Sequence, residues 1–78
     1  MPTTADDIRQ SLLAQDPEYR RLAEEHLRCE MQLQQIHEER YLNAEDLALE
    51  VTLKKTKVHL RDLMELMVSR HKHALAAH

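Results

Sequence analysis

Glycine, phenylalanine and tryptophan are absent from this chain, and proline occurs only twice in its 78 residues. The only aromatic residues are Tyr19 and Tyr41. Hairpin turns favour glycine and strands favour aromatic and β-branched residues, so this composition argues against a β-rich fold. The absence of glycine also excludes the glycine-rich loops with which P-loop and dinucleotide-binding proteins hold phosphates.

Cysteine occurs once, at Cys29, so the chain cannot form an internal disulfide. A lone thiol suits a reducing compartment, and we therefore expect a cytoplasmic protein. The first ten residues, MPTTADDIRQ, contain neither the basic start nor the apolar run of a signal peptide. No stretch approaches the ~20 apolar residues of a membrane span, so no membrane association is predicted.

Neither sign of charge dominates, because 11 basic and 14 acidic residues are interspersed and the formal net charge is −3. The abundant residues are Leu, Glu, Arg, Lys, Ala, Gln and Met, which are strong helix formers. We therefore predict a single all-α domain over residues 1–78. A short helix is expected over about 4–15, long helices over about 17–40 and 44–72, and a frayed tail over 73–78.

Capping residues mark the start of each predicted helix. The start signals are Thr3 and Thr4 before Asp6 and Asp7, Asp16 before Pro17, and Asn43 before Glu45 and Asp46. A short connection near Asn43 makes the two long helices antiparallel neighbours in a hairpin. The alternative is one continuous helix through Asn43 that dimerises as a long coiled coil.

Each long segment carries one apolar face with heptad-like steps of three and four residues, which indicates coiled-coil character. In the first the face comprises Tyr19, Leu22, His26, Cys29, Leu33, Ile36 and Arg40. In the second it comprises Leu49, Leu53, Thr56, Leu60, Leu63 and Met67, with Met64 and His71 beside it. Counting outward from the turn of a hairpin places Glu30 within reach of Lys57.

The second long segment also has apolar residues nearly opposite this face, at Leu47, Val51 and Val58. A helix in an isolated hairpin needs only one apolar face. We therefore expect either the N-terminal helix, Ile8 to Leu13, or a second protomer to cover the other. Leu27 and Met31 provide another candidate contact surface. These residues predict a dimer or tetramer that binds an unidentified protein partner.

A basic cluster suggests a second possible function. Lys54, Lys57 and Arg61 share a helix face, with Lys55 nearby, and could bind nucleic acid or another anion. No aromatic residue interleaves them for base stacking, and the chain is acidic overall. A solvated face that pairs with acids such as Glu30 or Glu50 is the favoured interpretation.

Metal and catalytic sites have weak sequence support. His26 and Cys29 lie one helical turn apart and could form half of a zinc site, but zinc normally needs four ligands. A partly buried histidine beside a small apolar cysteine is the favoured interpretation. The tail histidines His71, His73 and His78 could bind metal adventitiously. No nucleophile–base or carboxylate pair stands out, so we predict a non-enzymatic protein without a cofactor.

Two stretches, DPEYRRLAEEHLRCEMQL and LKKTKVHLRDLM, resemble the YdcH-like family of small bacterial proteins of unknown function. The similarity covers about Ile8 to Val68. Its matching positions are Pro17, Tyr19, Leu22, His26, Cys29 and Leu33, followed by the lysine-rich run from Leu53 to Asp62. Cys29 replaces the family's usual leucine, and Leu63 stands where an acid is common. The resemblance implies a helical hairpin with coiled-coil character and no known activity.

Overall fold

The computed structural model describes residues 4–39 and 43–76. These residues form three helices and no strand, which confirms the all-α prediction: α1 is Ala5–Gln15, α2 is Pro17–Glu38 and α3 is Ala44–Ala76. α3 continues past its predicted end near Lys72, so residues 73–76 of the predicted tail are helical. Four residues used in the predictions, Thr3, Arg40, Tyr41 and His78, lie outside the described residues.

The predicted caps at Thr4, Asp16 and Asn43 are confirmed by their hydrogen bonds. The Thr4 hydroxyl accepts from the backbone N–H of Asp7 at 3.1 Å, and the Asp7 carboxylate accepts from the N–H of Thr4 at 3.2 Å. The Asp16 carboxylate accepts from the first turn of α2, and the Asn43 side chain accepts from the N–H of Asp46 at 2.9 Å. Each cap satisfies donors that have no partner inside the helix.

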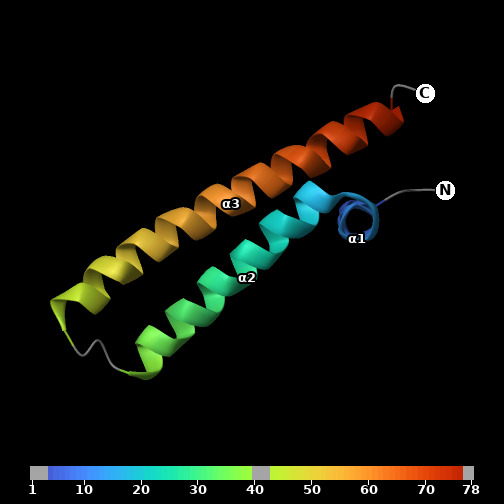
Figure 1. Ribbon diagram of the computed structural model, residues 1–78. Coiled ribbons are helices and arrows are strands. Elements are labelled where there is room, and N and C mark those ends of the chain that lie inside the picture. Colours follow the sequence, from blue (N-terminus) through green and yellow to red (C-terminus); the bar gives the residue numbers. More distant parts are fainter. Residues whose placement is uncertain (1–3, 40–42, 77–78) are drawn as a thin grey trace.

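α2 and α3 lie side by side and run in opposite directions, while α1 crosses the end where α2 begins (Figure 1). The molecule is elongated, with principal extents of 54 × 20 × 17 Å. Its main core comprises Leu22, Cys29, Leu33, Ile36, Leu53 and Leu60. The predicted proximity of Glu30 and Lys57 is confirmed by an ion pair of 3.2 Å.

The inner face of α3 differs from the predicted one at two positions. Leu53 is 7% exposed as expected, but Leu49 is 44% exposed and Thr56 also faces solvent. Glu50 and Lys57 are more buried than these two residues. The spacing from Glu50 through Leu53, Lys57 and Leu60 also follows steps of three and four, so leucine periodicity alone did not decide the face. In this orientation Glu50 and Lys57 form ion-pair or hydrogen-bond contacts with α2. Their aliphatic carbons cover apolar surface while the charged ends reach solvent.

α1 builds a second, smaller core at the far end of the long helices. Ile8 is 1% exposed and packs with Leu12, Tyr19 and Val68, and Met64 and Met67 contact both cores. Val68 was not among the predicted core residues. The expectation that α1 could cover Leu47, Val51 and Val58 is wrong for this structure, because its apolar face is already used against Tyr19 and Val68.

Candidate interaction surface

A groove runs between α2 and α3 with a volume of about 560 Å³. It is lined by Glu30, Leu33, Gln34, His37, Lys54, Lys57, Val58 and Arg61. Two polar contacts link α2 and α3 across it. His37 Nε2 lies 2.9 Å from Glu50 Oε2, and Lys57 Nζ lies 3.2 Å from Glu30 Oε1. These cross-helix pairs combine with the apolar core beneath them to hold α2 beside α3.

Five large apolar side chains of α2 and α3 are between 47% and 62% exposed, and one of them, Val58, lines this groove. We call this set the groove face: Leu27, Met31, Leu47, Val51 and Val58. Residues three or four apart are neighbours on a helix surface. Leu27 and Met31 lie one turn before Glu30 and Gln34, which line the groove. On α3, Val58 lines the groove itself, while Val51 lies one turn before Lys54 and Leu47 one turn before Val51.

The groove face has features of a protein–protein interface. Its apolar side chains are about half exposed or more, and α1 packs against none of them. Isolated exposed apolar residues are normal on a soluble protein, whereas a contiguous exposed apolar surface marks a contact site. All five predicted interface residues are exposed, two on α2 and three on α3.

The predicted basic residues lie beside carboxylates. Lys54 is 3.4 Å from Glu50, Lys57 is 3.2 Å from Glu30, and Arg61 is 3.8 Å from Asp62. Lys55 lines a shallow hollow on α3 with Val58, His59 and Asp62. An incoming phosphate would meet interleaved acids along this face. The arrangement favours the solvated, internally paired interpretation over a phosphate-binding patch.

His26 and Cys29 occupy the seam between the helices. Cys29 is a buried free thiol, and His26 Nδ1 lies 3.9 Å from Glu30 Oε1. Among residues 4–39 and 43–76, no group of three or more His, Cys, Asp or Glu side chains could hold a metal ion. Cys29 packs in the main core, while His26 is partly exposed and lies near the Glu30 carboxylate.

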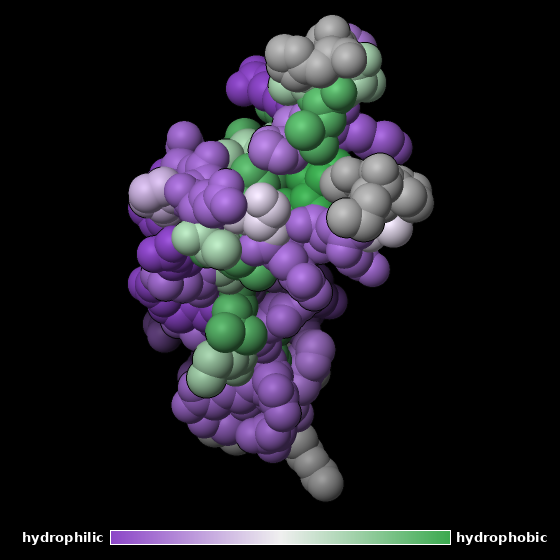
Figure 2. Space-filling model, turned by 90° about the vertical axis from the view of Figure 1, so that its right-hand side faces the viewer, coloured by the Kyte–Doolittle hydropathy of each residue, from purple (hydrophilic) through white to green (hydrophobic). Residues whose placement is uncertain are grey.

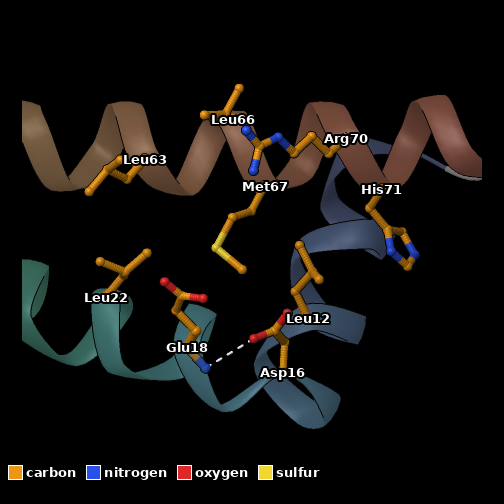
Figure 3. Close-up of a pocket in the computed structure, with 9 residues that line it drawn as sticks. All are labelled: Leu12, Asp16, Glu18, Leu22, Leu63, Leu66, Met67, Arg70 and His71. Carbon is orange, nitrogen blue, oxygen red and sulfur yellow. Dashed lines mark hydrogen bonds between the residues drawn. The ribbon is translucent and has the colours of Figure 1, made fainter.

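A second hollow, of about 410 Å³, lies where the three helices meet (Figure 3). It is lined by Leu12, Asp16, Glu18, Leu22, Leu63, Leu66, Met67, Arg70 and His71. Sequence reasoning did not find this corner hollow. The one feature of the sequence that pointed to it is the helix break at Asp16-Pro17. The chain changes direction there, so α1 does not fill the space beside α2.

The electrostatics of this end centre on Tyr19. Burial raises the pKa of Tyr19 above its usual value, the positive charge of Arg9 opposes this increase, and the Glu65 carboxylate adds to it. Arg9 donates to both carboxylate oxygens of Glu65, at 2.9 and 3.2 Å, and so links α1 to α3. These contacts raise the pKa of Arg9, which stays protonated.

Comparisons with protein-family models, with curated proteins and with solved structures find no match for this chain. The resemblance to the YdcH-like family therefore stays a prediction. In the part of the chain that the structure describes, no helix is both long and apolar enough to cross a bilayer. The groove face and the corner hollow are the surfaces from which a function can be inferred.

Proposed function

We propose that this protein is a non-enzymatic helical interaction protein that self-associates through the groove face into a dimer or tetramer. The observation that carries the proposal is the exposure of five large apolar side chains, three of them along α3. The sequence allowed two candidates to cover this surface, α1 or a second copy of the chain. Since α1 packs against Tyr19 and Val68, a second copy is the occupant that we propose. The buried free thiol of Cys29 supports a reducing, cytoplasmic location.

The strength of the association follows from the exposed area. Burying a large aliphatic side chain completely contributes ~1.5–3 kcal/mol, so a half-exposed one contributes about 1 kcal/mol. Five side chains from each copy would give roughly 10 kcal/mol if one interface buried them all, against an association cost of about 4–15 kcal/mol. The two terms are comparable, so we expect a reversible, concentration-dependent assembly rather than an obligate one.

The mass of the protein in solution tests this proposal. Size exclusion with light scattering, from about 1 µM to 1 mM, should show the mass rising toward a multiple of the monomer mass. Val58→Glu places a charge in the groove face and should keep the chain monomeric. Leu75→Glu is the matched control, because Leu75 is 48% exposed but lies near the end of α3, and it should associate like wild type.

Two outcomes would contradict self-association through the groove face. One is a wild-type protein that stays monomeric across the whole concentration range. The other is a Leu75→Glu variant that dissociates as readily as Val58→Glu. Circular dichroism of both variants confirms that they remain helical, so that loss of association is not confused with loss of folding.

The alternative function is binding of nucleic acid or another anion by Lys54, Lys55, Lys57 and Arg61. It is favoured by the cluster of cations, and it is weakened by the carboxylates beside three of them. Fluorescence anisotropy with labelled single- and double-stranded DNA would distinguish the two functions. Phosphate contacts strengthen as salt falls, so binding at low salt that weakens steeply with added salt would favour this alternative.

A further inference from the structure

The apolar residues of the groove face belong to two helix stripes with matching spacing. Side chains three or four residues apart share one side of a helix. The α2 stripe is Glu24, Leu27, Met31, Gln34 and Glu38, and the α3 stripe is Leu47, Val51, Lys54, Val58 and Arg61; all of these residues are exposed. Read from opposite ends, the two stripes have the same steps of three, four, three and four residues. This is the spacing with which the side chains of two packed helices interlock.

Both stripes face away from the seam between α2 and α3. A helix turns by about 100° per residue, so a side chain two positions from a core residue lies about 200° around the helix from it. The outer and core residues related in this way are Leu27 and Met31 with Cys29, Val51 with Leu53, and Val58 with Leu60. A second molecule can therefore reach either stripe while the hairpin core stays intact.

Exposed apolar residues alone do not identify a partner. Figure 2 shows apolar side chains emerging among hydrophilic ones on the side of the molecule that it views, which is common on protein surfaces. The charges within the two stripes are more informative, because they have opposite signs. The α2 stripe begins and ends with a glutamate, whereas the α3 stripe contains two cations, Lys54 and Arg61.

Both cations are accessible to a partner. The side chains of Lys54 and Arg61 are 58% and 63% exposed, although each has a carboxylate of its own helix nearby. Arg28 beside the α2 stripe and Asp62 beside the α3 stripe reduce the contrast in charge but do not reverse it. Two copies that met through the same stripe would bring like charges together, whereas unlike stripes bring carboxylates toward cations.

We propose that the α2 stripe of one copy packs against the α3 stripe of a second copy. This inference rests on the proposed function, because it specifies which surfaces meet when the protein self-associates. The apolar residues of the two stripes pack together, and the glutamates of the α2 stripe lie toward Lys54 and Arg61 of the other copy. The contact joins two different surfaces, and each copy carries one of each kind.

Mixing two single variants tests this pairing. Met31→Glu alters the α2 stripe and leaves the α3 stripe intact, and Val58→Glu does the reverse. Each variant alone should stay monomeric where wild type associates, because every contact would include one altered stripe. An equimolar mixture should form a heterodimer through the two intact stripes. Its apparent affinity should exceed that of either variant alone by at least about tenfold, since a charge buried in an apolar contact is costly.

Light scattering measures the mass of the mixture, and native mass spectrometry identifies a species with one copy of each variant. Circular dichroism checks that both variants are helical. If either loses helix, Leu27→Glu or Val51→Glu replaces it in the same stripe. A Met31→Glu variant that associates like wild type would overturn the pairing, and so would a mixture that stays monomeric. A monomeric wild type would remove the proposed function as well, whereas wild-type association without complementation removes only this pairing.

Salt tests the charge pattern independently. The Debye length falls from ~30 Å at 0.01 M to ~3 Å at 1 M salt, so attraction between unlike stripes is screened over this range. Wild type should therefore associate at least about threefold more weakly at the higher concentration. Arg61→Gln should reduce this salt dependence more than Lys55→Gln, which lies outside the α3 stripe. Association that strengthens with salt would indicate pairing of like stripes and overturn the proposal.

Discussion

Lys57 of α3 places its ammonium nitrogen 3.2 Å from Oε1 of Glu30 on α2. The 2.9 Å contact between His37 and Glu50 lies nearer the turn, as antiparallel helices require. Together the two contacts define which turn of α3 faces which turn of α2. Any change of register between the helices would break both, so the pairs provide an experimental measure of the alignment.

Reversing one charge tests that alignment. Lys57→Glu places a carboxylate beside Glu30 and should lower the free energy of unfolding. Both side chains are more than a third exposed, so the loss should be less than about 1 kcal/mol. The double variant Glu30→Lys with Lys57→Glu should recover most of it in urea unfolding. Lys55→Glu is the control, and no recovery in the double variant would argue against the Glu30–Lys57 contact.

Truncating two leucines of α3 tests which face it buries. Leu53→Ala removes a buried core side chain and should reduce the free energy of unfolding by about 2–5 kcal/mol. Leu49→Ala removes a side chain that is 44% exposed and should cost less than about 1 kcal/mol. Thermal and urea unfolding measure both variants. A larger loss for Leu49→Ala would restore the face that leucine spacing alone predicted.

Removing the cap between α1 and α2 should destabilise the corner. The Asp16 carboxylate accepts from the N–H groups of Glu18 and Tyr19 at 2.9 and 3.1 Å. Asp16→Ala leaves these donors without a side-chain partner and should cost about 1 kcal/mol. Asp16→Ser keeps an acceptor and should cost less in the same thermal unfolding experiment. Equal losses for the two variants would mean that the cap contributes little.

Ionisation of Tyr19 should weaken the fold at alkaline pH. Burial raises its pKa, so the folded state holds the phenolic proton more tightly than the unfolded chain does. The contribution of Tyr19 to stability is therefore complete below the unfolded pKa of about 10 and is lost as pH rises through the folded pKa.

Urea unfolding between about pH 9 and pH 11 measures this loss. Tyr19→Phe, which lacks the phenolic hydroxyl, is the necessary control. Its stability should decline less steeply than that of wild type over this range. Identical slopes for the two proteins would contradict a raised pKa for Tyr19 in the fold.

Local signals in the sequence predicted the helices well, and they did so through identifiable residues. Thr4, Asp16 and Asn43 marked helix starts because capping is a contact between near neighbours in the chain. The pairing of Glu30 with Lys57 followed from counting residues on either side of one turn. Features that depend on the chain's path in space were less predictable. Glu50 and Lys57 share the three-and-four spacing of the apolar residues, so periodicity could not reject them as seam positions.

The packing of α1 against α2 and α3 could not be predicted for a similar reason. Ile8 and Leu12 were recognised as an apolar face, but their partner depends on the angle at Asp16, which no local signal specifies. Val68 is buried only because α1 turns toward it. The groove face was predicted as a set of residues, and the structure adds that all five are exposed and that Val58 lines the groove between α2 and α3.

The division of the interior into two cores gives the molecule two levels of stability. α1 contacts the rest of the chain through Ile8 and Leu12, through the exposed ion pair of Arg9 with Glu65, and through exposed hydrogen bonds that Arg20 donates to the carbonyls of its last turn. Its 11 residues form too short a helix to persist alone in water. α1 should therefore detach and unfold as a unit while α2 and α3 stay paired, so its amides should exchange with solvent faster than those around Leu33 and Leu60. The protein would then spend part of its time as a two-helix hairpin without α1, in which Tyr19 and Val68 are exposed to solvent and to other molecules.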